Sequence, residues 1–255
     1  MNEQKIFECA ISLFHKDDFN GYYLEPQFKD VSRYIFVSDP EEENKDYKLC
    51  LSLLKKLHQD IRNVSLIAER YDYNQKLSEK GIINGRWKTY TAIDIQYFFI
   101  ELRSMMDYIA QILNVICFQG KTKRERKKCE SFNGLLSILD KKDFTNNLVE
   151  DIVSVLKSYQ TWFEHIRKIR DHLVHYGANI MTFDENNEVL FQIYNSGLDE
   201  QVMQYRYVMY NENAVYFSKS ISLHMAFLLC FLSDISNKVF CFLNKKKYSL
   251  KHPMI

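Results

Sequence analysis

The chain of 255 residues is long enough to bury a full hydrophobic core, as one large domain or as one domain with a small annex. Its composition, 46% hydrophobic and 26% charged residues, is that of a soluble globular protein, and its net charge of +1 excludes attraction of nucleic acid or membranes by overall charge. Only 7 glycines and 3 prolines interrupt the chain, which indicates a mostly helical fold.

The first part of the chain gives the fewest structural signals. Residues 1–43 are an N-terminal segment of uncertain packing, and residues 44–255 follow as one helical domain. Residues 34–37 predict a strand, closed by a Ser-Asp-Pro turn at residues 38–40. Residues 1–5 lack the pattern of a signal peptide, and the six cysteines form no Cys-x-x-Cys pair. Both observations favour a cytoplasmic protein with reduced thiols over a zinc site or a disulfide framework.

Long stretches with apolar residues at helical spacing dominate the rest of the chain. They predict helices over residues 46–78, 88–118 and 144–174, with a shorter helical segment from residue 131, and Gly81 interrupts the first pattern. The second long helix is apolar on nearly every face, so we expect a central helix that neighbours bury on several sides. Each polar residue in it should then contact another helix or a wet cleft. These residues are Asp94, Glu101, Arg103 and Asp107.

The periodicity changes after residue 177. Residues 180–183 and 189–193 flank a polar run that contains asparagines, which predicts a β-hairpin, and residues 202–210 predict a further strand. The β region therefore covers about residues 179–210. A last helix is expected over residues 218–243; its most apolar stretch is too short to span a bilayer, and we interpret it as a buried helix. The predicted fold class is mainly α, a helical bundle with a small β-hairpin inserted before the last long helix.

The end of the third long helix concentrates ionisable residues. Phe163, Ile166, Ile169 (or Arg170) and Leu173 recur at helical spacing and should face a core. Gly177 is placed to end the helix in the left-handed conformation. In the last turn, the negative end of the helix dipole favours the protonated form of a histidine at position 175.

The spacing of Arg170 and His175 sets a geometric constraint. Five residues along a helix turn it through about 500°, so the two side chains project roughly 140° apart. One straight helix does not aim both at the same atom well, and a site shared by two subunits or a loosened last turn would solve this. Asp171 shares a face with His175 and is placed to orient either the imidazole or the neighbouring guanidinium. From its polarity, Glu101 is a candidate for the buried acid that positions Arg170.

Residues 170–175 resemble the signature of the HEPN superfamily, an Arg followed by four to six residues and a His, commonly with a polar residue directly after the Arg. Here four residues separate Arg170 from His175, and the polar residue is Asp171. The Tyr-Gly that follows is similar to the usual continuation in bacterial members. The resemblance covers roughly residues 44–243, without the hairpin, and implies a HEPN-like helical bundle.

The resemblance implies a metal-independent endoribonuclease, a hydrolase that serves as a toxin of a toxin–antitoxin pair or as an antiphage-defence effector. It implies a homodimer whose two motifs line one cleft, with RNA as substrate, an antitoxin or defence-system protein as a further partner, and neither cofactor, metal nor membrane. The residue chemistry is compatible. His175 would deprotonate a ribose 2′-OH or protonate the leaving 5′-oxygen, and Arg170 would hold the scissile phosphate. The products would be a 2′,3′-cyclic phosphate and a 5′-hydroxyl.

Further residues are candidates for support of this site. His172 lies three residues before His175 and would assist it, and Arg167 would contact a flanking phosphate. The run at residues 121–128 is basic and is either a solvated connector or a phosphate-binding patch. The candidate RNA contacts in this run are Lys123, Arg124 and Arg126.

Other interpretations of the motif stay open. Arg170 and His175 are also compatible with a salt bridge and a helix cap of purely structural role. His172-x-x-His175 lacks a visible third ligand, which argues against a metal site. A non-catalytic HEPN-like module that binds RNA, a nucleotide or a protein partner is the main alternative to the ribonuclease. The sequence contains no phosphate-binding Gly-rich loop, nucleophile elbow or zinc-protease motif, so those enzyme classes are disfavoured.

Overall fold

The computed structural model describes residues 4–6, 8, 45–117, 127, 129–139, 147–175, 179–185, 188–194, 205–211 and 214–245. Within these residues the fold is mainly α-helical, with a small three-stranded antiparallel sheet before the last long helix. The predicted fold class is confirmed. The predicted strand at residues 34–37, the basic run up to residue 126 and the helix stop at Gly177 lie outside the described residues.

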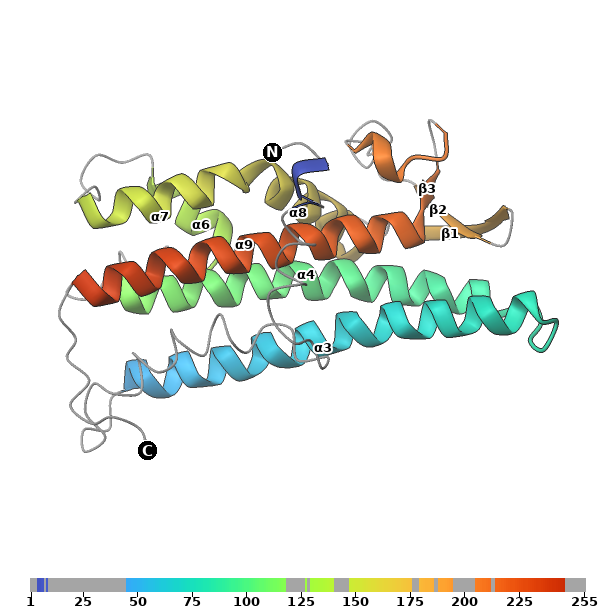
Figure 1. The fold of residues 1–255 in the computed structure, drawn as a ribbon, viewed down its shortest axis with the longest axis horizontal. Helices are drawn as coiled ribbons and strands as arrows, with labels where there is room; N and C mark the ends of the chain where they lie inside the picture. Colours follow the sequence, from blue (N-terminus) through green and yellow to red (C-terminus); the bar gives the residue numbers. More distant parts are fainter. Residues whose placement is uncertain are drawn as a thin grey trace. The chain divides into compact units, whose positions relative to one another are not determined.

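The helices and strands carry the labels of Figure 1. The helices are α3 (Lys45–Glu79), α4 (Trp87–Cys117), α6 (Phe132–Leu139), α7 (Asn147–Ser158), α8 (Gln160–His175) and α9 (Phe217–Lys245). The strands are β1 (Asn179–Glu185), β2 (Glu188–Tyr194) and β3 (Val215–Tyr216). The bounds of α3, α4 and α9 agree with their predicted ranges to within about two residues, because each helix buries a long apolar stripe.

The end of α3 shows why the first pattern stops where it does. Gly81 has φ 69°, the left-handed conformation that glycine adopts without steric strain. Its N–H donates to the carbonyl of Ser78 at 2.9 Å, and the N–H of Ile82 donates to the carbonyl of Leu77 at 3.0 Å. This pair of bonds is a Schellman motif, which satisfies carbonyls that the helix end would leave open.

The prediction of one helix over residues 144–174 is wrong, because Tyr159 separates α7 from α8. The Tyr159 hydroxyl donates to Asp234 at 2.8 Å, and its ring centre lies 5.1 Å from that of Phe231. The hydroxyl of Ser158 donates to the carbonyl of Val155 at 2.8 Å, a local bond that competes with helical continuation. Tertiary contacts thus hold Tyr159 where periodicity alone would extend the helix.

The prediction of a strand over residues 202–210 is wrong for the part that the structure describes. Residues Arg206–Val208 form a 3₁₀ helix, and Met209 makes an isolated antiparallel bridge to Val215. Tyr205 and Val208 are both buried, and their spacing of three fits the period of a 3₁₀ helix rather than strand alternation. The third strand is β3, which leads directly into α9.

The chain divides into two compact units, and each is described by itself. The first unit comprises Met1–Cys9, Asp60–Ser104 and Thr161–Phe227; the second comprises Ala10–Gln59, Met105–Gln160 and Leu228–Ile255. The long helices α3, α4 and α9 contribute a segment to each unit.

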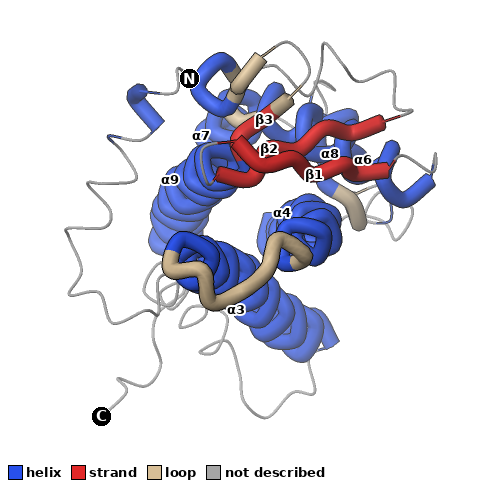
Figure 2. The backbone as a smooth tube through the Cα atoms, turned by 90° about the vertical axis from the view of Figure 1, so that its right-hand side faces the viewer, coloured by secondary structure: helices blue, strands red, loops and turns tan. Residues whose placement is uncertain are grey.

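In the first unit, the sheet packs on an aromatic core. Strand β2 lies between β1 and β3, as Figure 2 shows, and it is the buried strand. The Phe191 ring centre lies 6.4 Å from that of Phe99 and 6.1 Å from that of Phe217. The N–H of Val189 donates to the Tyr71 hydroxyl at 3.2 Å. These contacts connect the predicted hairpin, which the structure confirms as β1 and β2, to the helices of its own unit.

The prediction that neighbours bury α4 on several sides holds in this unit with one exception, Ile93, which is 66% exposed. The apolar side chains that are buried as expected are Ile95, Phe98, Phe99 and Leu102. The polar residues of α4 mostly behave as expected. Arg70 of α3 forms an ion pair with Asp94, and the guanidinium carbon of Arg103 lies 4.9 Å from the centre of the Phe163 ring on α8.

The second unit has an apolar core. The Phe231 ring centre lies 5.8 Å from that of Phe132 on α6 and 5.1 Å from that of Tyr159. Asp107 accepts a hydrogen bond of 2.8 Å from the N–H of Phe132, which satisfies a donor in the first turn of α6. The expectation that Asp107 contacts another helix is confirmed.

Helix α9 includes a stretch, Phe217–Val239, of 23 residues with mean hydropathy 1.3. By length and composition alone this stretch is able to cross a membrane, and it is longer than the most apolar stretch on which the sequence-based expectation relied. However, 78% of its most apolar window is buried in the protein, as in the core helices of soluble proteins, which meet the same criteria. The interpretation as a buried helix is confirmed, and this burial is compatible with a soluble protein.

Candidate functional site

Helix α8 presents the motif at its C-terminal end, within the first unit. The apolar stripe that the sequence predicts is buried: Phe163, Ile166, Ile169 and Leu173. This anchoring leaves the other face at the surface. The side chains of Arg170 and Asp171 are 31% and 36% exposed, and His175 is exposed as well.

A direct contact joins the two residues of the motif. Arg170 Nη1 lies 2.9 Å from His175 Nε2, and the same Nη1 donates to Asp171 Oδ1 at 3.0 Å. One guanidinium nitrogen therefore links the imidazole to the carboxylate. The structure brings the three residues together at one point on the surface of α8.

This arrangement corrects the geometric expectation. The Cα–Cβ directions of Arg170 and His175 diverge along a helix, but the arginine side chain is long enough to reach around the helix to the imidazole. Neither a second subunit nor a loosened last turn is needed to bring the two groups into contact.

The contact also defines a donor and an acceptor. A guanidinium is always charged and has only donors, so a hydrogen bond at this distance has His175 Nε2 as its acceptor. Which ring nitrogen of His175 carries the proton depends on the tautomer.

The expectation that Glu101 positions Arg170 is wrong. Glu101 is buried in α4 and hydrogen-bonds with Tyr97, one turn earlier on the same helix; this bond to the carboxylate raises the pKa of Tyr97 to about 12. The acid that contacts Arg170 is Asp171, its neighbour in sequence. The hydrogen bond of Glu101 thus stays within α4, and its Oε2 atom is buried without a hydrogen-bond partner among the described residues.

The other candidates are less closely connected to the motif. His172 and Arg167 are half-buried on α8, and the hydrogen bonds of the guanidinium at position 170 involve neither of them. Lys123, Arg124 and Arg126 lie outside the described residues. Within the described part of the chain, no group of three or more His, Cys, Asp or Glu side chains is arranged to hold a metal ion.

A buried histidine pair in the first unit was not predicted. The indole N–H of Trp162 donates to His224 Nδ1 at 3.0 Å, and the rings of His165 and His224 stack with centres 5.6 Å apart. Burial lowers the pKa of His224 well below its usual value, and the charge of His165 would lower it further. His165 is buried in the core of this unit. The signal for its partner was a lone histidine within the apolar run of α9.

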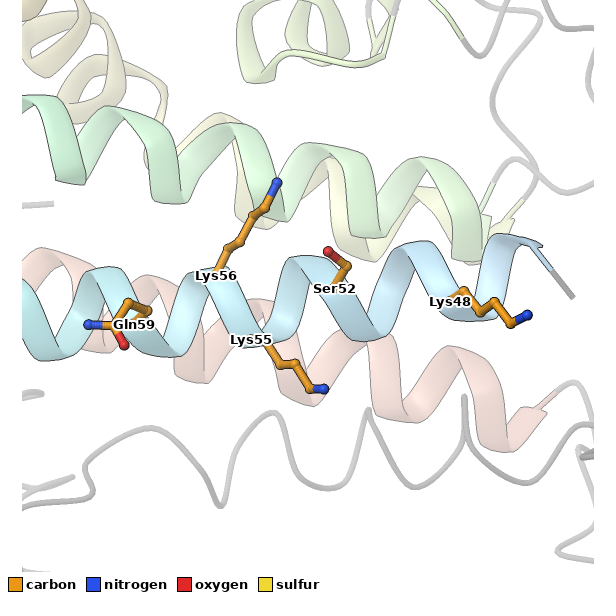
Figure 3. A pocket seen from close by; sticks show the side chains of 5 residues that line it. All are labelled: Lys48, Ser52, Lys55, Lys56 and Gln59. Carbon is orange, nitrogen blue, oxygen red and sulfur yellow. The ribbon is translucent and has the colours of Figure 1, made fainter.

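A basic hollow on α3 was also missed. It has a volume of about 440 Å³, belongs to the second unit, and is lined by Lys48, Ser52, Lys55, Lys56 and Gln59. Figure 3 shows that all five side chains project from α3. The sequence does contain a signal for this hollow, since its lysines are seven and eight residues apart, a spacing that places them on one helix face. This basic face was overlooked because the apolar stripe of the same helix is the stronger pattern.

Comparisons with models of known protein families, with curated proteins and with solved structures found no match. The contacts among Arg170, Asp171 and His175 on α8 are therefore the basis for a functional proposal.

Proposed function

We propose that this protein is a metal-independent endoribonuclease of the HEPN type, with Arg170, Asp171 and His175 as its catalytic site. The observation that carries the proposal is the 2.9 Å contact between Arg170 Nη1 and His175 Nε2. It combines a permanent cation and an unprotonated imidazole nitrogen at the protein surface, which are the two groups that cleavage of RNA without a metal requires.

The reaction would begin when a phosphate of RNA replaces His175 as an acceptor for the Arg170 guanidinium. This exchange frees His175 Nε2, which then takes the proton of the adjacent ribose 2′-OH. The 2′-oxygen attacks phosphorus, the bond from phosphorus to the 5′-oxygen breaks, and the guanidinium stabilises the charge that develops on the phosphate oxygens. A 2′,3′-cyclic phosphate and a 5′-hydroxyl result.

The leaving 5′-oxygen needs a proton, and a homodimer supplies a second imidazole for this purpose. In the proposed dimer, His175 of one protomer is the general base and His175 of the partner subunit is the general acid. Asp171 keeps the guanidinium in position through its 3.0 Å hydrogen bond. We place the enzyme in the cytoplasm, as a toxin or antiphage effector that an antitoxin or defence-system partner restrains.

The test is cleavage of total cellular RNA in EDTA by the wild type, Arg170→Ala and His175→Ala, with the product ends mapped. Loss of a general base or of the phosphate-binding cation should reduce cleavage by at least about a hundredfold. His58→Ala is the matched control, since His58 is an exposed histidine on α3, outside the motif. Thermal denaturation of each variant shows whether the fold is retained.

Cleavage by the wild type and His58→Ala alone, with cyclic-phosphate ends, supports the proposal. Equal cleavage by folded His175→Ala and wild type contradicts it. A second candidate function, a non-catalytic module that binds RNA, a nucleotide or a protein partner, is favoured by the saturation of Arg170 within its own helix. That candidate predicts binding that survives His175→Ala and no cleavage by any form.

A further inference from the structure

The segment between the sheet and α9 exposes aromatic side chains that the motif does not use. Tyr207 and Tyr210 are 43% and 41% exposed, although tyrosine rings contribute most to stability when they are buried. Both residues belong to the first unit, which also contains α8. Figure 1 shows the short helix that carries Tyr207 beside β3.

These tyrosines form a continuous group with a third tyrosine and a lysine. The Lys219 ammonium lies 3.8 Å from the centre of the Tyr216 ring and 6.0 Å from the centre of the Tyr207 ring. The Tyr210 ring centre lies 5.5 Å from that of Tyr216, with an interplanar angle of 88°. We call Tyr207, Tyr210 and Tyr216, together with Lys219, the tyrosine platform.

The platform is fixed to the core of its unit. Tyr205, two residues before Tyr207, is buried, and its ring centre lies 5.2 Å from that of His165 on α8. Val208 is buried as well, and Tyr216 pairs with Leu190 in the sheet. Because these anchors hold the backbone on both sides, the exposed rings lose little further conformational freedom when a ligand binds.

The platform has both acids and cations at its edge, and the cations are the groups that would contact a phosphate. Glu185 accepts a hydrogen bond from the Tyr210 hydroxyl, and its charge raises the pKa of that tyrosine. Glu188 accepts a hydrogen bond of 2.8 Å from Ser218. Each acid thus accepts a hydrogen bond from a hydroxyl group. Among the residues that the structure describes, the ammonium of Lys219 lies over the faces of two tyrosine rings, and Arg206 is exposed beside Tyr207.

Exposed aromatic faces next to cations match the chemistry of single-stranded nucleic acid. Unpaired bases stack on tyrosine rings whatever their sequence, and lysine and arginine contact the neighbouring phosphates. In a duplex the bases are stacked on one another and do not reach such rings. We propose that the tyrosine platform binds unpaired bases of RNA, so that it selects single-stranded substrate. This inference rests on the proposed function, since it assigns the substrate class of that ribonuclease.

The experiment measures binding without cleavage, in the full chain with His175→Ala. The probe is a fluorescein-labelled single-stranded oligouridylate, and the measurement is its anisotropy at fixed ionic strength. In this background Tyr207→Ala should weaken binding about tenfold, the effect of one lost stacking partner. Tyr207→Phe should restore it, because stacking needs the ring and not the hydroxyl.

The controls use two tyrosines of the same unit that are more exposed than Tyr207. Tyr73 and Tyr90 are 63% and 64% exposed on α3 and α4, and their replacement by Ala should leave the affinity unchanged. A second probe of equal length carries abasic sugars, so that it presents phosphates without bases. It should bind weakly, and Tyr207→Ala should not weaken it further.

Three outcomes overturn the inference. They are equal affinities for Tyr207→Ala and Tyr90→Ala, a loss with Tyr207→Ala that is the same for the abasic probe, and no binding of oligouridylate by the parent His175→Ala chain. Each outcome is independent of the cleavage assay. If wild type cleaves RNA while Tyr207→Ala binds normally, the RNA-binding role of the platform is contradicted and the ribonuclease proposal is supported. If binding depends on Tyr207 but no form cleaves RNA, the binding role is supported and the ribonuclease proposal is contradicted.

Discussion

The two units of this protein differ in what they bury. The first unit buries several acidic and histidine side chains, whereas the Asp, Glu, His, Lys and Arg side chains in the described part of the second unit are exposed or half-exposed. The acidic and histidine side chains buried in the first unit are Asp94, Glu101, His165 and His224. In the second unit the buried polar residues are neutral: Asn114, Ser233 and Ser236.

The interior of the second unit is therefore mainly apolar, whereas the interior of the first unit combines apolar packing with polar contacts. A buried ionisable group destabilises a fold unless a partner compensates it. In the first unit the partners are present, such as Arg70 for Asp94 and Trp162 for His224. Two of these groups, His165 and His224, lie on or against α8, the helix that carries the motif. Buried ionisable groups of this kind are more frequent near functional sites, so their place in the first unit is consistent with a site there.

The largest expected effect on stability lies in the apolar core of the second unit. Phe231→Ala removes a ring that contacts both Phe132 and Tyr159, so it should lower the free energy of unfolding by about 3–5 kcal/mol. The matched change is Phe183→Ala in the first unit, where the side chain is 37% exposed and the loss should stay below about 1 kcal/mol. Urea denaturation measures both. Similar losses would mean that packing does not distinguish the two positions.

The next effect tests the hydrogen bond of the buried histidine pair. Trp162→Phe leaves His224 Nδ1 buried without its donor, so it should destabilise the protein by about 1–3 kcal/mol. Trp87→Phe is the control: Trp87 is also buried, but its indole N–H has no hydrogen-bond partner among the described residues. Its substitution should therefore be milder. A loss for Trp87→Phe equal to that for Trp162→Phe would show that ring volume, not the hydrogen bond, decides the result.

The pH dependence of stability should be a property of the first unit. Because burial lowers the pKa of His224, the unfolded chain takes up a proton below the ordinary value of 6.5 while the folded chain does not. Stability is complete above that pH and should fall as the pH decreases, by up to about 1.4 kcal/mol per pH unit for one group. His224→Gln should reduce this slope, and His58→Gln, at an exposed position, should not. Urea denaturation between pH 7 and pH 5 compares the three proteins.

The elements that the sequence predicts well are those determined by local pattern. The bounds of α3 follow from an apolar stripe and from Gly81, which has positive φ at the helix end. The break at Tyr159 was not predictable, because it depends on Asp234, 75 residues further along the chain. The same reason explains His224, whose partner Trp162 is 62 residues away.

In the candidate site, too, local pattern predicted the position of the residues but not their contacts. The position of Arg170 and His175 at the exposed end of α8 follows from the apolar stripe on the opposite face. The contact between them was missed because the spacing argument used the directions of the Cα–Cβ bonds and ignored the reach of a guanidinium. Glu101 was assigned by polarity alone, and polarity does not specify which neighbour a buried acid contacts.

The smallest expected effects on stability come from two charge-removing variants, and they distinguish a catalytic role of a carboxylate from a structural one. Asp171→Asn removes the charge of a pair that is about one-third exposed, and Asp151→Asn does the same to the surface pair with Lys238 in the second unit. Each should change the free energy of unfolding by less than about 1 kcal/mol, since solvent screens both pairs. Only Asp171→Asn should also reduce RNA cleavage, by about tenfold, because the charged acceptor that orients Arg170 is lost. If the two variants cleave RNA equally well, Asp171 has no part in catalysis and the proposed site reduces to Arg170 and His175.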